Sequence, residues 1–456
     1  MKRALLVAAL GGCISLSPTY ERPIAPVPKQ LPGGQGSANA AAMPIAEFVH
    51  EDKLRQILTK VLGANRTLRR SALDIESARQ LYRVQRAAEL PSIDLSAQVT
   101  STRSLIGTTD NATARFTDYT VGVGIASWEV DLFGRIKSLS DAKLQSYLAS
   151  VELAKATRIS LIAEASTAYV TMSADRSRLA IAKDTMESSK KAMDLTEALV
   201  GGGTSNRGDF YQASTVYQQA RGDVAALTAA IAQDKNALEL LAGDSLDDSL
   251  MPDVLPVQPE WFTEVPVGLD STVLLDRPDV LAAEHDLMAA NANIGAARAQ
   301  FFPSLNLTAT GGLGSVALAS LFTGPAALWT LAPALALPLF RGGANRANLA
   351  YTKAQKLSFV AAYELAIQTA FREVSDALAT RATIQEQLAA QAALVEASTK
   401  ALELSQARYK AGIDTFLMTL ISERALYAAQ NSLVATQLAA MSNRITLYRV
   451  LGGGLR

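Results

Sequence analysis

Residues 91–97, Pro-Ser-Ile-Asp-Leu-Ser-Ala, recur at residues 303–309 as Pro-Ser-Leu-Asn-Leu-Thr-Ala, and every position is identical or conservatively replaced. Other landmarks recur in the same order at an offset of about 210 residues, Gly203 with Gly412 and Gly243 with Gly452. One such pair could arise by chance, but several in the same order could not. The sequence therefore predicts an internal duplication.

In each copy the hydrophobic period changes from helical to alternating at the repeated proline. Helices are predicted at 51–89 and 276–301, because a residue before proline avoids the helical conformation. After Pro91, apolar residues such as Leu95 alternate with polar ones, which is typical of a strand with two different faces. The predicted strands are about 92–103, 115–129, 304–314 and 326–338.

The stretch from Val316 to Phe340 is nearly all apolar and long enough for a membrane-spanning helix. Its prolines, Pro325, Pro333 and Pro338, would remove several helical hydrogen bonds. A turn at 323–325 followed by a strand accommodates them and is favoured.

Two very long helices are predicted at 135–200 and 345–411, each reaching about 100 Å. In the second helix, the side chains at one heptad position are bulky, with Arg381 as the only interruption. The side chains three residues later in each heptad are mostly small. This pattern favours coiled-coil-like packing, but an ordinary long coiled coil without a channel stays open. The predicted division is a signal peptide at 1–12, an extended arm at 13–46, a first repeat at 47–252, a linker at 253–270 and a second repeat at 271–456, with helical hairpins turning near 201–209 and 411–414.

Composition and the N-terminus restrict the possible functions. Lys plus Arg number 43 and Asp plus Glu number 43, so there is no basic excess for nucleic-acid binding. The single cysteine, Cys13, follows a charged start and a short apolar run, as in a bacterial lipoprotein signal, and Ile14 stands where an Asp would suggest inner-membrane retention. We expect cleavage before Cys13 and its acylation, with no other cofactor.

Four alternating strands cannot close a barrel alone, since about eight is the smallest closed number. Three chains would supply about twelve strands and leave room for a passage. Apolar rows, including Trp329, would then face lipid and Ser, Thr, Asn and Gly rows would face water. A soluble sandwich would explain the strands but not the lipoprotein signal beside such long helices.

Two motifs carry a family resemblance. One is Asp131-Leu132-Phe133-Gly134-Arg135; the other comprises Arg277, Pro278, Asp279, Val280, Ala283, Glu284, Leu287, Ala290, Asn291, Ala292, Ile294, Gly295, Ala297, Arg298, Ala299, Phe302, Pro303 and Ser304. With them the chain resembles outer membrane factor lipoproteins, the OprM-like, TolC-type efflux channels, over essentially its whole length. The resemblance implies an α+β membrane protein: a homotrimer with a shared twelve-stranded β-barrel and a long helical barrel. It also implies two partners, a periplasmic adaptor (membrane fusion) protein and an inner-membrane drug/proton antiporter. The location that it implies for this chain is the outer membrane.

The candidate functional residues lie at the predicted hairpin turns. Gly203, Asp209 and Gly412 belong to the turns themselves. After the second turn, Asp414, Leu417, Ile421 and Arg424 form one helical stripe, which threefold symmetry would turn into rings.

The resemblance implies that the positions of Asp414, Leu417 and Arg424 form the periplasmic constriction. Ile421 departs from the acidic residue expected there, so the predicted gate is an apolar plug of Leu417 and Ile421 reinforced by Asp414 and Arg424. Asp414 could equally be a helix N-cap.

Catalysis and metal binding are not expected. His50 and His285 are the only histidines and lie far apart, which leaves no basis for a catalytic triad or a metal site. The favoured function is the outer-membrane exit duct of a tripartite multidrug efflux system. The exit duct of a type I protein secretion system and a structural periplasmic lipoprotein without a pore stay open.

Overall fold

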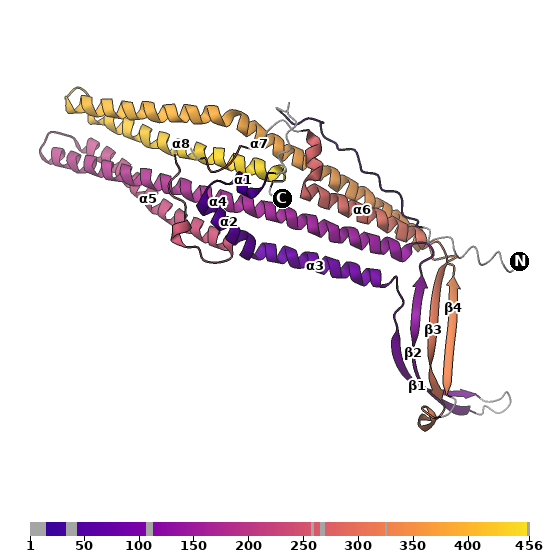
Figure 1. Cartoon of the computed structure of the whole chain (residues 1–456). Helices are drawn as coiled ribbons and strands as arrows, with labels where there is room; N and C mark the ends of the chain where they lie inside the picture. Colours follow the sequence, from indigo (N-terminus) through magenta and orange to yellow (C-terminus); the bar gives the residue numbers. More distant parts are fainter. Residues whose placement is uncertain are drawn as a thin grey trace. The chain divides into compact units, whose positions relative to one another are not determined.

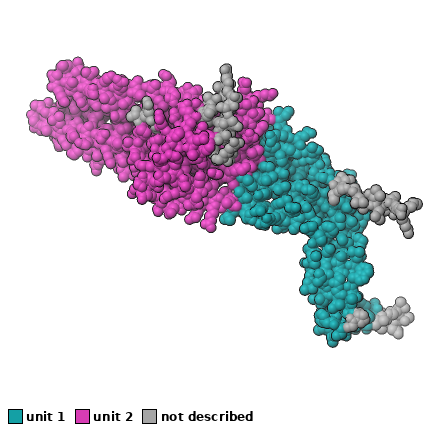
Figure 2. All heavy atoms as spheres, in the orientation of Figure 1, with its two compact units in different colours: residues 1–24, 73–151, 282–364 teal, residues 25–72, 152–281, 365–456 magenta. Residues whose placement is uncertain are grey.

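The computed structural model describes residues 15–32, 43–105, 113–256, 260–264, 270–323 and 326–453. Cys13 and the predicted signal peptide lie outside these residues. The chain forms two compact units (Figure 2). Unit 1 comprises Met1–Ile24, Leu73–Val151 and Ala282–Glu364; unit 2 comprises Ala25–Ala72, Glu152–Leu281 and Leu365–Arg456. Each unit takes segments from both sequence repeats, because the long helices of each repeat contribute residues to both.

Unit 1 contains one antiparallel sheet in the order β1-β2-β3-β4 (Figure 1). The strands are β1 (Asp94–Leu105), β2 (Thr113–Val130), β3 (Ser304–Ser315) and β4 (Ala327–Ala336). All four predicted strands are present, and Val316–Phe340 contains β4 and the short 3-10 helix η4 (Leu318–Ser320) rather than a long helix. The β2–β3 pairing joins the two repeats into a single sheet.

The strand register gathers the apolar side chains on one face. Leu95 pairs with Val123, and Leu305 pairs with Leu335, so the alternation of each strand is in phase with its neighbour's. Between Ile125 and Trp128 the β2–β3 register shifts at a bulge. The extra residue in β2 keeps both side chains on the apolar face.

The helices before the strands differ from the prediction in one respect. The predicted helix 51–89 is two helices, α2 (Asp52–Ala64) and α3 (Arg66–Ala87). Asn65 separates them, because its side-chain oxygen accepts hydrogen bonds from the backbone N–H groups of Thr67 and Leu68 and so caps α3. Its amide nitrogen also donates to the Leu241 carbonyl, which holds the break in place.

The second copy of this segment begins differently. A 3-10 helix, η3 (Ser271–Asp276), precedes α6 (Pro278–Ala299), so the predicted helix 276–301 is shorter at both ends. The short helices α1 (Ile45–Phe48) and η2 (Asp248–Leu250) complete the smaller elements.

Two long hairpins follow the strand pairs. They are α4 (Arg135–Gly201) with α5 (Arg207–Ala242) and α7 (Ala344–Lys410) with α8 (Phe416–Val450). Both α4 and α7 have 67 residues, which is direct structural evidence for the duplication. Within the described residues, no helix combines the length and the apolar character needed to cross a membrane.

Three residues of the predicted heptad seams of α7 are buried. Ile367, Val374 and Ala377 are all 4% exposed or less. Arg381, which interrupts the seam, forms an ion pair with Glu264 of the linker at 3.2 Å, and Arg444 of α8 reaches the same carboxylate at 3.4 Å. The interruption therefore ties the linker to the hairpin.

A buried arginine organises part of the core of unit 2. Arg277 is 6% exposed and pairs with Asp279 at 2.7 Å and Glu373 at 2.9 Å. It also donates to the carbonyl of Val450 at the end of α8. Because all three guanidinium nitrogens donate to an acceptor, the buried charge is compensated and joins α6, α7 and α8.

Candidate functional site

The two hairpin turns share one backbone geometry. Gly203 and Gly412 have φ values of 74° and 73°, a left-handed conformation that glycine adopts without steric cost. In each turn the next N–H reaches back five residues, Thr204 to the Leu199 carbonyl and Ile413 to the Arg408 carbonyl, both at 2.9 Å. The glycines were predicted as turn residues because of their spacing, and their φ values supply the physical reason.

The first turn is closed by its own polar side chains. Asn206 is the N-cap of α5 and accepts a hydrogen bond from the backbone N–H of Asp209. The Asp209 carboxylate accepts from the Ser205 hydroxyl and the Asn206 amide, both at 2.9 Å. Asp209 thus stabilises the start of α5, and its carboxylate forms these hydrogen bonds within its own turn.

The second turn is closed by an ion pair. Arg408, in the last turn of α7, donates from Nε to Asp414 Oδ2 at 2.6 Å and from Nη2 to Oδ1 at 3.0 Å. The hydrogen bond from Arg408 holds the pKa of Asp414 below its ordinary value. The N-cap of α8 is Thr415, so the N-cap alternative for Asp414 is wrong. Sequence reasoning missed Arg408, although its position six residues before Asp414, across the glycine, was a usable signal.

Arg424 has different partners from Asp414. Its guanidinium donates to the Thr215 hydroxyl and, at 3.5 Å, to the Gln212 side chain, both on α5. Within one chain it therefore ties α8 to α5. The predicted stripe is present on α8, but its two charged residues belong to separate contacts.

The apolar residues near the start of α8 divide between two faces. Leu420 is 2% exposed and packs with Ala213 and Val216 of α5. Leu417 and Ile421 lie four residues apart on another face and are 42% and 50% exposed. Two large apolar side chains directed away from their own hairpin are suited to contact another copy or to line a constriction.

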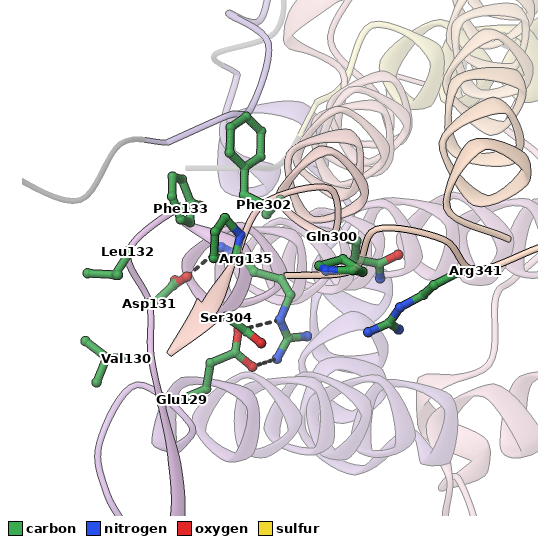
Figure 3. Close-up of a pocket in the computed structure, with 13 residues that line it drawn as sticks. Glu129, Val130, Asp131, Leu132, Phe133, Arg135, Gln300, Phe302, Ser304 and Arg341 are labelled. Atoms are coloured by element: carbon green, nitrogen blue, oxygen red, sulfur yellow. Dashed lines mark hydrogen bonds and ion pairs between the residues drawn. The ribbon is translucent and has the colours of Figure 1, made fainter. Parts of the chain in front are cut away.

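The motif at residues 131–135 lies where β2 meets α4 (Figure 3). Asp131 caps α4 by accepting from the backbone N–H groups of Arg135 and Lys137, both at 2.7 Å. Arg135 makes a two-pronged ion pair with Glu129, at 2.8 and 2.5 Å.

Across this junction the rings of Phe133 and Phe302 stack at 4.8 Å. A cavity of about 280 Å³ lies beside them, lined also by Arg341. These contacts fix the direction in which α4 begins after β2, so the motif has a structural role at the base of the sheet.

The histidines are engaged in ordinary hydrogen bonds. His50 contacts the Thr263 hydroxyl at 2.9 Å and His285 contacts the Gln145 side chain at 2.7 Å. Among the described residues there is no group of three or more His, Cys, Asp or Glu side chains placed to hold a metal ion.

Comparison with known proteins identifies the family. The profile described as "Outer membrane efflux protein" matches residues 57–244 and 269–453, one match for each repeat. The chain belongs to the outer membrane efflux protein family. It is 42% identical over 454 residues to the solvent efflux pump outer membrane protein SrpC of Pseudomonas putida, covering 98% of this chain and 96% of SrpC. It is also 39% identical to the outer membrane protein OprJ of Pseudomonas aeruginosa, covering 99% and 95% of the two chains.

Solved structures of membrane proteins share the fold. A membrane protein from Pseudomonas aeruginosa superposes with a TM-score of 0.90 at 39% identity, covering 96% of this chain and 98% of that one. The open state of the MtrE outer membrane channel of Neisseria gonorrhoeae gives 0.88 at 34% identity, covering 97% and 99%. The predicted family, channel-type α+β fold, efflux function and outer-membrane location are thereby confirmed.

Proposed function

We propose that three copies of this efflux protein form a passive duct through the outer membrane and the periplasm. The observation that carries the proposal is the four-stranded sheet. It has one apolar face, and its outer strands β1 and β4 each pair on one side only among the described residues. Open edges are not tolerated in lipid, so the edges must pair with those of other copies. Three copies give about twelve strands, enough for a water-filled passage.

The curvature of the sheet supports the same assembly. A methyl group on Gly312 would lie 2.2 Å from the carbonyl oxygen of Val121 and 2.5 Å from Cα of Gly122, whereas one on Gly311 would meet nothing within 4 Å. Neighbouring strands therefore lean together on the side of Gly312, which makes that face concave. Because Gly312 shares its face with Asn306 and Thr308, the polar face is the inner one and the apolar face is directed to lipid.

The gate is proposed at the second hairpin turn. Threefold symmetry repeats the exposed Leu417 and Ile421 as apolar rings that can exclude water. The Arg408–Asp414 pair stiffens the turn just before α8, and Arg424 holds α8 against α5. Gating then requires that α8 move, with these polar contacts setting its closed position.

The proposed partners and cargo come from the relatives. Relatives are named for solvent, toluene and antibiotic efflux pumps. We infer that this chain passes small apolar and amphipathic molecules, receives them from an inner-membrane drug/proton antiporter through a periplasmic adaptor, and carries out no chemical step. Acylation of Cys13 would anchor it to the outer membrane.

Deletion of the chain from a strain without a redundant channel tests this function. Susceptibility to toluene and to unrelated antibiotics should rise, and expression of the wild-type chain should restore resistance. Purified protein should conduct ions in planar bilayers. Conductance with unchanged susceptibility would favour a protein-secretion duct, and absence of conductance would favour a lipoprotein without a pore.

A further inference from the structure

The N-terminal arm lies along α6 in the opposite direction. Near the end of α6, Arg298 donates to the Leu16 carbonyl at 3.1 Å. Seven residues earlier, or about two helical turns, Asn291 donates to the Pro18 carbonyl at 2.7 Å. Earlier still, Glu284 accepts from the Tyr20 hydroxyl at 2.9 Å. The arm therefore runs from the strand end of α6 toward its start.

Glu284 makes the strongest of these contacts. Its side chain is only 3% exposed, and Arg22 of the arm reaches it through Nε at 2.7 Å and Nη2 at 2.6 Å. The Glu284 carboxylate accepts three hydrogen bonds from the arm, two from Arg22 and one from Tyr20. If the arm left, a buried carboxylate would lose these donors, which is strongly unfavourable. The charge of Glu284 therefore favours a docked arm.

Gly295 provides the space for the arm. A methyl group there would lie 2.1 Å from Oγ of Ser17 and 2.8 Å from its Cα. Oγ of Ser17 is also 3.0 Å from Oγ of Ser138 on α4, so the arm fills a site formed by two helices.

We propose that Glu284, Asn291, Gly295 and Arg298, on one face of α6, form a docking track for the arm. The intervals of seven, four and three residues place these side chains on the same helical face. The track keeps Leu16 of the arm beside Arg298, close in sequence to the beginning of β3. Resting on the proposed acylation of Cys13, which is only three residues before Leu16, docking would limit how far the lipid anchor can lie from the base of the sheet. It also gives these motif residues a role that is separate from the gate.

Accessibility of a cysteine in the arm tests docking directly. Ser17→Cys should react slowly with a maleimide in the intact protein, and the parent chain, with Cys13 alone, gives the background. Glu284→Gln and Arg22→Ala should each make the reaction several-fold faster. Glu152→Gln is the matched control, because it breaks an ion pair with Lys155 within α4 that involves no residue of the arm. Equal rates in Glu284→Gln and in the control would overturn the track.

A disulfide tests whether docking places the anchor. Ser17→Cys with Ser138→Cys should form a disulfide under an added oxidant, since the two hydroxyls are in contact. Glu284→Gln should lower the amount of the protein recovered in the outer membrane several-fold, and the disulfide should restore it until a reductant is added. If the disulfide fails to form, or forms without restoring recovery, the proposed role is wrong. Neither readout depends on conductance or efflux, so a failure of the proposed function would be seen separately.

Discussion

Arg408 and Asp414 face each other across the turn between α7 and α8, with Nε of Arg408 2.6 Å from Oδ2 of Asp414. The two residues are six positions apart, and Gly412 reverses the chain between them. The pair therefore holds the last turn of one helix to the residues that begin the next. A contact at this position constrains how α8 can tilt.

Asp414→Asn should increase single-channel conductance in planar bilayers several-fold, because it keeps the side-chain shape but removes the charge that orders the turn. Glu396→Gln, which breaks the exposed pair with Lys400 elsewhere on α7, should leave conductance unchanged. Because the pKa of Asp414 is lowered, its contribution is lost only as pH falls through that lowered value. The Arg408–Asp414 pair should therefore stay intact between about pH 5 and 8, and its loss should not change wild-type conductance over that range.

Leu417→Ala and Leu420→Ala should separate gating from stability. Leu420 is 2% exposed, so its truncation should lower the free energy of unfolding by about 2–5 kcal/mol. Leu417 is 42% exposed in the chain, so its truncation should change thermal stability much less but raise conductance. Circular dichroism melting and bilayer recordings on both variants check this. Equal conductance of Leu417→Ala and wild type would remove Leu417 from the gate.

Gly312→Ala and Gly311→Ala are adjacent changes on opposite faces of β3. The first places a methyl group 2.2 Å from a backbone oxygen and should reduce the folded protein in the outer membrane several-fold. The second meets nothing within 4 Å and should be tolerated. Quantification of membrane fractions checks the pair, and similar losses for both variants would contradict the assigned concave face.

Asp234 on α5 should make stability depend on pH. Burial, together with repulsion from Asp175, raises the pKa of Asp234 to about 6. Its Oδ2 is buried without a hydrogen-bond partner among the described residues. Since the folded pKa lies above the ordinary value, ionisation destabilises the fold, and this penalty is fully present above about pH 6 and disappears below about pH 4.

Asp234→Asn should therefore raise the melting temperature at neutral pH and leave it unchanged near pH 4. Asp194→Asn, at an exposed pair with Lys190, should have little effect at neutral pH. A stabilisation of Asp234→Asn that is the same at both pH values would show that charge is not the cause.

The sequence by itself determined the repeated architecture. The recurrence around Pro91 and Pro303, the change of hydrophobic period and the paired glycines predicted the strands, the long helices and the turns at Gly203 and Gly412. These features are local: proline, glycine and alternation act on their own neighbours in the chain, so their consequences can be read in one dimension. The break at Asn65 was missed because a capping asparagine inside a helical pattern resembles any other polar surface residue.

Only the tertiary structure decided which residues meet. It paired Asp414 with Arg408 rather than assigning it to the N-cap, and it connected Arg424 to α5. It placed Arg22 on Glu284, two residues separated by the whole first repeat, the linker and the start of the second repeat. Such contacts depend on the register of strands and the rotation of helices, which small shifts of backbone change completely. Sequence spacing sets the faces of an element, but packing decides what each face touches.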